Sequence, residues 1–145
     1  MLLRPRARYF RLGSLLSLLA FFLLAVVLRP SAVAATWDPD AFAREDIVRL
    51  CTVGPEEGEY CFPVWLVVID GRVYVRLGSR AADRVEKNTR KPYLKIEIAG
   101  QKFEQIRADP VPDMAQRVSR AMADKYTSDL LIRWLPHPLT MRLEP

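Results

Sequence analysis

Hydrophobic and polar residues follow two different patterns along this chain. Residues 12–28 carry no charge, and they follow a start that is rich in arginine. Beyond residue 36 the apolar residues come in short runs separated by turn residues, a pattern typical of strands and short helices. The sequence therefore divides into an apolar leader, 1–35, and one folded domain, 36–145.

The folded domain is predicted to be mainly β. Its apolar runs predict five or six strands, at residues 47–53, 62–69, 72–76, 94–98, 102–109 and 139–143. The run 62–69 is almost entirely apolar, which indicates a strand buried on both faces. Asp70-Gly71 predicts a tight hairpin between that strand and the next. We therefore expect a small antiparallel β-barrel.

Two or three helices are expected beside these strands. Asp38 and Asp40 precede apolar residues at helical spacing, so a short opening helix is predicted there. Residues 79–88 and 113–126 have the pattern of longer amphipathic helices, and Pro92 ends the connection after the first of them. The helices are thus inserted at two connections between strands.

The leader has the three parts of a secretory signal peptide. Four arginines precede the apolar run, and small residues 31–35 follow it, so cleavage is expected after Ala34 or Ala35. An uncleaved membrane anchor is the alternative. A helix of this length spans about 25 Å, which is less than the roughly 30 Å of bilayer hydrocarbon. In both cases the domain is expected outside the cytoplasm, either periplasmic or secreted, or anchored to the membrane.

The positive charge of the chain belongs to this leader. The sequence has 22 Lys+Arg and 17 Asp+Glu, hence a formal charge of +5. Five of the bases lie within residues 1–35, which contain no acid, so the remainder is formally neutral. The high isoelectric point therefore reports an export signal, and we expect no nucleic-acid partner.

The two cysteines of the chain are placed symmetrically about a turn. Cys51 and Cys61 are each five residues from Glu56, so a regular antiparallel hairpin would place them opposite each other. That separation permits a disulfide, which an oxidising compartment would preserve. Two buried free thiols are the alternative.

Several familiar chemistries have no motif in this sequence. It has no P-loop, GxGxxG, CxxC or HExxH motif, and no metal site is expected. The only histidine, His137, lies between two prolines and is interpreted as a solvated turn residue. No catalytic acid or base can be singled out.

A basic segment at residues 72–95 is the best candidate for ligand binding. It holds eight Lys or Arg residues against Asp83 and Glu86. Arg80, Arg84 and Lys87 share one face of the predicted helix, whose start could receive a phosphate. A solvated basic face is the alternative interpretation.

The order of elements over residues 46–109 resembles the flavin-binding split-barrel superfamily, which includes pyridoxamine-phosphate oxidases and deazaflavin-dependent reductases. The residues that carry the resemblance are Pro63, Val64, Trp65, Leu66, Val67, Val68, Asp70-Gly71, Val73, Tyr74, Val75, Gly78-Ser79-Arg80, Arg84, Asn88 and Pro92. Lys125-Tyr126 and residues 140–145 are similar to a small uncharacterised branch of that superfamily, near the deazaflavin-dependent reductases.

The resemblance implies a split β-barrel, a homodimer and a flavin held at the interface between subunits. By position, the phosphate of FMN or a deazaflavin would meet Arg76, Ser79, Arg80 and Arg84, with Trp65 near the ring. One hypothesis is therefore an exported flavin- or deazaflavin-dependent oxidoreductase acting on an unknown small substrate.

The alternative hypothesis is a non-catalytic exported split-barrel domain that binds a small ligand or a partner protein and holds no cofactor. Two features favour it. The hydroxyl residue usual just after the third strand of the family is replaced by Arg76-Leu77. An export signal of this type also delivers an unfolded chain to a compartment that is poor in flavin nucleotide.

Overall fold

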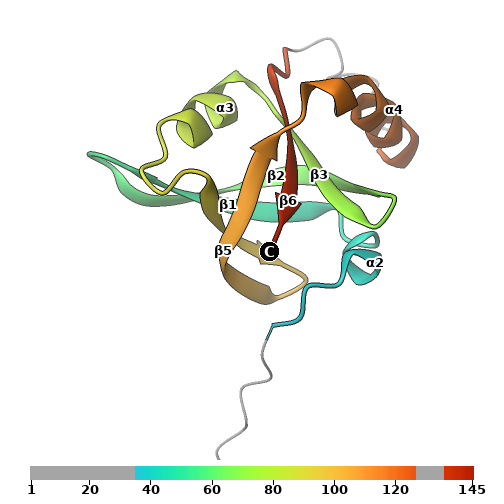
Figure 1. Ribbon diagram of the computed structural model, residues 1–145, viewed down its shortest axis with the longest axis horizontal. Coiled ribbons are helices and arrows are strands. Elements are labelled where there is room, and N and C mark those ends of the chain that lie inside the picture. Colours follow the sequence, from blue (N-terminus) through green and yellow to red (C-terminus); the bar gives the residue numbers. More distant parts are fainter. Residues whose placement is uncertain (1–34, 127–135) are drawn as a thin grey trace, which may run out of the picture. The chain divides into compact units, whose positions relative to one another are not determined.

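Six antiparallel strands close into a barrel in the computed structural model, which describes residues 35–126 and 136–145. The strands are β1 (Ile47–Gly54), β2 (Gly58–Ile69), β3 (Arg72–Leu77), β4 (Tyr93–Ile98), β5 (Gln101–Pro110) and β6 (Leu139–Glu144). Their order around the barrel is β1-β2-β3-β6-β5-β4 (Figure 1). The predicted fold class, a small antiparallel barrel with helices, is confirmed.

The leader lies outside the described residues, so the signal peptide stays a prediction. No helix within the described ranges has the length and apolar character needed to cross a membrane.

Two turns with left-handed backbone set the register of the barrel. Asp70 and Gly71 have φ of 52° and 70°, and Ala99 and Gly100 have φ of 51° and 72°. Two consecutive positive φ values define the tight turn whose twist matches that of antiparallel strands. These turns join β2 to β3 and β4 to β5, so the hairpin predicted at Asp70-Gly71 is confirmed.

Alternation of side chains separates the barrel interior from its outer face. On β4, Leu94, Ile96 and Ile98 are buried, whereas Lys95 and Glu97 lie on the outside. The same alternation on the other strands fills the barrel with aliphatic side chains, among them Val48, Leu50, Leu66, Val73, Val75, Ile106, Met141 and Leu143. The core is therefore a packed interior, as expected for a small barrel.

Two helices cover different parts of this barrel. The short α2 (Pro39–Phe42) begins at Asp38, whose carboxylate accepts hydrogen bonds from two backbone N–H groups of the first turn. It carries the fully buried Phe42 into the barrel core. Helix α4 (Ala115–Lys125) follows the 3-10 turn η1 (Pro112–Met114) and packs Val118 and Met122 on the outer face of β2 and β3.

Helix α3 (Ser79–Glu86) connects β3 to β4 and ends two residues earlier than the sequence predicts. The helix stops before Asn88 because the buried Asn88 side chain hydrogen-bonds to backbone groups outside the helix. Its Oδ1 accepts from the N–H of Val53 at 3.0 Å, and its Nδ2 donates to the carbonyl of Tyr93 at 2.9 Å. The side chain thereby ties the end of the helix to β1 and β4.

Strand β2 differs from the sequence-based expectation. It starts at Gly58, four residues before the predicted position. Within residues 62–69 the strand is covered on both faces, as expected, although only Leu66 and Val67 are fully buried. Phe62, Val64 and Val68 pack against the barrel core, and Trp65 and Ile69 pack beside α4 on the outer face. The earlier part of β2 belongs to the β1–β2 hairpin, which extends beyond the other strands (Figure 1).

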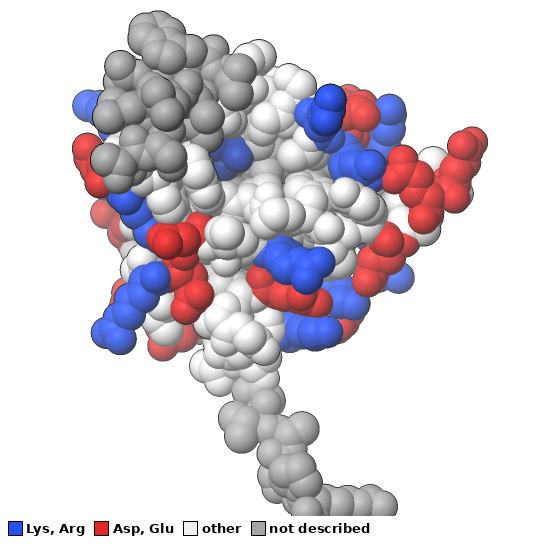
Figure 2. All heavy atoms as spheres, turned by 180° about the vertical axis from the view of Figure 1, so that it is seen from behind, with Lys and Arg blue, Asp and Glu red and all other residues white. Residues whose placement is uncertain are grey.

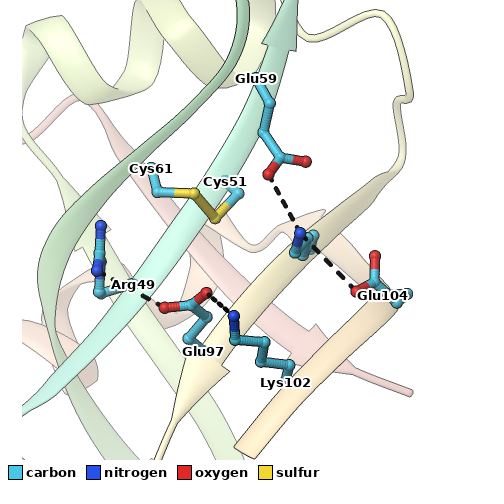
Figure 3. Close-up of polar contacts among 8 residues, drawn as sticks. Arg49, Cys51, Glu59, Cys61, Glu97, Lys102 and Glu104 are labelled. Atoms are coloured by element: carbon cyan, nitrogen blue, oxygen red, sulfur yellow. Dashed lines mark hydrogen bonds and ion pairs between the residues drawn. A yellow bond between two sulfur atoms is a disulfide. The ribbon is translucent and has the colours of Figure 1, made fainter.

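The extended hairpin carries the predicted disulfide. Cys51 and Cys61 are direct partners in the β1–β2 register, with their Cα atoms 4.0 Å apart and their sulfurs bonded. The bridge lies on the outer face of the sheet (Figure 3). The predicted disulfide is confirmed.

Ion pairs surround the disulfide on the same outer face. Lys95 contacts Glu59 at 3.1 Å and Glu104 at 3.8 Å, and the Glu59 hydrogen bond raises the pKa of Lys95. A second group of ion pairs joins the Glu97 carboxylate to Arg49 and to Lys102 (Figure 3). Basic and acidic side chains are also intermixed on the face shown in Figure 2, which agrees with a domain of no net charge.

Candidate functional site

Four of the five predicted binding residues border one groove, which we call the Trp65 groove. It consists of two adjoining hollows of about 320 and 390 Å³. Trp65 and Arg76 line the first, and Ser79 and Arg80 line the second. The two hollows share Gly78, Ala81 and His137 as walls. The end of β3 and the start of α3 thus bring together residues that the sequence places up to fifteen positions apart.

The indole of Trp65 is held in place by the end of α4. The Tyr126 ring stacks on it, with the centroids 4.8 Å apart and the planes 15° from parallel. The single proton of the Tyr126 hydroxyl is shared between the carbonyls of Leu66 at 2.6 Å and Asp46 at 2.8 Å. Burial raises the pKa of Tyr126 to about 12, so the hydroxyl keeps its proton at neutral pH. The stacked pair is therefore a rigid aromatic wall.

Lys125 strengthens the same junction. Its ammonium donates to the carbonyl of Glu45 and lies 3.4 Å from the carbonyl of Leu66 and 3.9 Å from the Asp46 carboxylate. Burial lowers the pKa of Lys125, and the carboxylates of Asp46 and Glu45 partly offset that shift. In the sequence, Lys125-Tyr126 contributes only to the family resemblance. The stacking of Tyr126 on Trp65 joins residues 61 positions apart, so local spacing could not reveal it.

The other wall of the groove is electropositive. Gly78 caps α3 without a side chain, and the first turn of the helix holds no acid. The partial positive charge of a helix N-terminus is therefore not neutralised by the chain's own capping residue. Arg76 precedes this N-terminus and Arg80 lies within its first turn. An anion with several oxygens suits such a wall.

Arg84, the fifth predicted binding residue, does not border this groove. Its guanidinium forms an ion pair with Glu57 in the β1–β2 turn and lies over the Tyr60 ring, 4.0 Å from the centroid. It lines a separate polar hollow of about 350 Å³ between α3 and the hairpin, together with Arg80 and Lys87. Arg84 can contact a phosphate in the groove only by leaving Glu57. The sequence could not reveal this pair, whose members are 27 positions apart.

The structure also changes the interpretation of His137. Although two prolines flank it, the side chain is half-buried and borders both hollows of the Trp65 groove. An isolated histidine between prolines carries no sequence signal for such a position.

The groove has the chemistry to hold a planar ring that carries a phosphate. An aromatic wall stacks on a ring, and two guanidinium groups beside a helix N-terminus bind phosphate oxygens. FMN and deazaflavins contain both parts, so the residues present fit such a cofactor.

No protein-family model matches this sequence, and no curated protein matches it. Several solved structures share its fold, among them the following two. One, described as a domain-swapped dimer, aligns with a TM-score of 0.53 and 10% identity over 91% of this chain and 100% of its own. The other, an F420-H2 dependent reductase, aligns with a TM-score of 0.51 and 12% identity, over 70% of this chain and 95% of its own.

These structural likenesses confirm the predicted fold. The chain has a split-barrel fold, which it shares with an F420-H2 dependent reductase. At such low sequence identity the shared fold carries no statement about activity.

Proposed function

We propose that this chain is an exported, homodimeric split-barrel protein that binds a flavin or deazaflavin in the Trp65 groove and acts as an oxidoreductase on a small substrate. The observation that carries the proposal is the grouping of Trp65, Arg76, Ser79 and Arg80 around two adjoining hollows. The F420-dependent reductase of the same fold supports a deazaflavin as the cofactor.

Each residue of the groove has a distinct part in this proposal. A bound flavin or deazaflavin would supply the hydride chemistry. Arg76, Arg80 and the Ser79 hydroxyl would bind the phosphate oxygens with charge-assisted hydrogen bonds. Trp65, fixed by Tyr126, would orient the ring and exclude water from one of its faces.

The homodimer in this proposal is supported by two observations. The domain-swapped dimer of the same fold shows that one such barrel assembles in pairs. The Trp65 groove is also open and shallow, with the half-exposed Ile47 at its edge, so a second chain could cover it.

The groove is tested by titrating the protein, as isolated from the expressing cell, with FMN and with the deazaflavin F420. Arg76→Ala and Arg80→Ala should each weaken binding about ten- to a hundredfold, the usual loss for a charge-assisted contact. Arg117→Ala is the matched control, because Arg117 pairs with Asp70 and does not border the groove. If neither cofactor binds at high micromolar concentration, the oxidoreductase proposal is wrong.

Arg84→Ala distinguishes two positions for the phosphate. A phosphate in the Trp65 groove leaves the Arg84–Glu57 pair intact, so this variant should bind as wild type does. A loss equal to that of Arg80→Ala would instead place the phosphate in the polar hollow between α3 and the hairpin.

Export is tested separately. The mature chain should begin at Ala35 or Thr36, which an intact mass of the protein from the extracytoplasmic fraction will show. A mass that retains residues 1–28 would indicate a membrane anchor.

A second candidate, a non-catalytic domain that binds a small ligand, is favoured by a different observation. A hollow of about 560 Å³ lies away from Trp65, Arg76 and Arg80. A purified protein that binds neither FMN nor F420 in the titration would support this candidate.

A further inference from the structure

An apolar cavity of about 560 Å³ lies beneath α3, at one end of the barrel. We call it the barrel-end cavity. Its apolar wall is formed by Ala82, Val85, Leu94, Ala108, Leu139 and Met141. The cavity falls within the usual size range of small-molecule sites, about 300–1,000 Å³, which are likewise mostly apolar with a few polar groups.

Small side chains contribute to the wall of this cavity. Ala82 on α3 and Ala108 on β5 both border it, where larger residues would fill the space. Val85, Leu94 and Met141 belong to the barrel core and are at most 5% exposed, so the wall is a continuation of that core. An apolar molecule bound there would contact a preformed surface.

The rim of this cavity is acidic, although it is formed largely by the basic segment 72–95. Residues 72–95 hold eight bases and two acids, Asp83 and Glu86. Both acids border the cavity, whereas Lys91 is the one base among the described residues of its lining. Arg80, Arg84 and Lys87 border the polar hollow beside the hairpin, and Asp83 lies at the rim of both hollows. Helix α3 therefore presents acidic side chains to the apolar cavity within a strongly basic segment.

Glu86 occupies an unfavourable position for a carboxylate. It is the last residue of α3, where the helix dipole disfavours negative charge. Asp83 is compensated by Lys87 at 2.9 Å, but Glu86 forms no ion pair within the described part of the chain. Glu86 is exposed, so water hydrates its carboxylate, and a cation bound at the rim would be its first charged partner among the described residues.

We propose that the barrel-end cavity binds a small aliphatic molecule that carries one amine. The aliphatic part contacts Val85, Leu94 and Met141, and the ammonium group lies at the rim beside Glu86 and Asp83. This site is distinct from the Trp65 groove, since only Ser79 borders both. The proposal does not depend on the binding of a flavin.

Three probes of equal chain length test the proposal: octylammonium, 1-octanol and octanoate. Each is titrated into the isotopically labelled protein, as isolated from the expressing cell, while backbone amide shifts are recorded by NMR. Octylammonium should bind most tightly and octanoate most weakly, and the shifting amides should include those of Val85, Leu94 and Met141. Three affinities that are equal, or an order led by octanoate, would overturn the proposal.

Rim variants test the role of the charge. Glu86→Gln should weaken octylammonium about three- to fivefold, as expected for a partly exposed ion pair, and leave 1-octanol unchanged. Lys91→Gln should strengthen octylammonium by a similar factor, because it removes a like charge. The matched control is Glu104→Gln, which makes the same chemical change on the outer face of β5. If Glu86→Gln and Glu104→Gln behave alike, the ammonium does not bind at this rim.

A filled cavity tests the location. Ala82→Phe places a ring in the cavity from the half-buried face of α3 and should abolish binding of all three probes. Retained binding in a folded Ala82→Phe variant would contradict the proposal. If this variant does not fold, the order of the probes and the Glu86→Gln result still decide it. Failure to bind FMN or F420 has no bearing on these outcomes.

Discussion

The Tyr126 hydroxyl joins three segments of the chain, and its removal has a cost that can be worked out from the structure. Tyr126→Phe deletes the hydrogen bonds to Leu66 and Asp46 but keeps the ring that stacks on Trp65. Each such bond contributes about 0.5–1.5 kcal/mol net. The carbonyl of Leu66 keeps Lys125 as a donor at 3.4 Å, and that of Asp46 keeps the N–H of Leu66 at 3.4 Å. Neither acceptor is orphaned, so we expect a loss of about 1–2 kcal/mol.

The same substitution changes how stability depends on pH. The pKa of Tyr126 is about 12 in the folded protein, against about 10 in an unfolded chain. Because the folded state holds this proton more tightly, its stabilising contribution is complete below pH 10 and is lost as the pH rises to 12. Between pH 8 and pH 11 wild type should lose about 1.4 kcal/mol that Tyr126→Phe does not lose.

Urea unfolding of both proteins at pH 8 and pH 11 measures this difference, and the remaining titrating groups cancel in the comparison. The stability gap should narrow from about 1–2 kcal/mol to near zero. Tyr60→Phe is the control, because Tyr60 is 47% exposed and the phenylalanine ring can keep the cation–π contact with Arg84. That variant should stay within about 0.5 kcal/mol of wild type at both values of pH. A stability difference between the two proteins that is the same at pH 8 and pH 11 would refute the conclusion that the Tyr126 hydroxyl is buried and hydrogen-bonded to the two carbonyls.

Three further outcomes are expected. Replacing both Cys51 and Cys61 with alanine should lower the free energy of unfolding, measured by urea titration, by about 2–3 kcal/mol, the value for a short closed loop. Wild type in a thiol reductant should lose the same amount. Arg84→Ala should cost only about 0.5–1 kcal/mol in the same assay, since its partners Glu57 and Tyr60 are exposed; a larger loss would mean that the hairpin depends on this contact. Light scattering at micromolar concentration should give the mass of a dimer, and a monomer would count against a groove covered by a second chain.

The parts of the fold that follow from local pattern could be predicted from the sequence. Alternation in Leu94, Ile96 and Ile98 identifies β4 and its inner face, because side chains on a strand point to opposite sides in turn. Asp70-Gly71 identifies a turn because its two residues tolerate positive φ. The Cys51–Cys61 bridge follows from equal distance to the turn at Glu56.

The parts that depend on contacts distant in sequence could not be predicted. The apolar run at 62–69 predicts a strand covered on both faces, but the segments that cover its outer face, α4 and Tyr126, lie far along the sequence and cannot be identified from the run itself. The five candidate binding residues share one stretch of sequence, yet the partner of Arg84 lies on that hairpin. The barrel-end cavity is lined by Ala82 of α3 and Ala108 of β5, and neither alanine by itself carries a sequence signal for such a position.

Helix α3 borders the Trp65 groove, the polar hollow and the barrel-end cavity. Because its side chains point in different directions around the helix axis, a substitution at one of these sites need not disturb another. Arg80 and Glu86 are six positions apart, which places them about 120° apart around the helix axis. Arg80 borders the Trp65 groove and the polar hollow, whereas Glu86 borders the barrel-end cavity. A substitution of Glu86 therefore leaves the phosphate-binding side chains in place, and a substitution of Arg80 leaves the cavity rim in place. Ser79 borders both sites, so Ser79→Ala is the one change in α3 expected to affect a phosphate ligand and an aliphatic amine together.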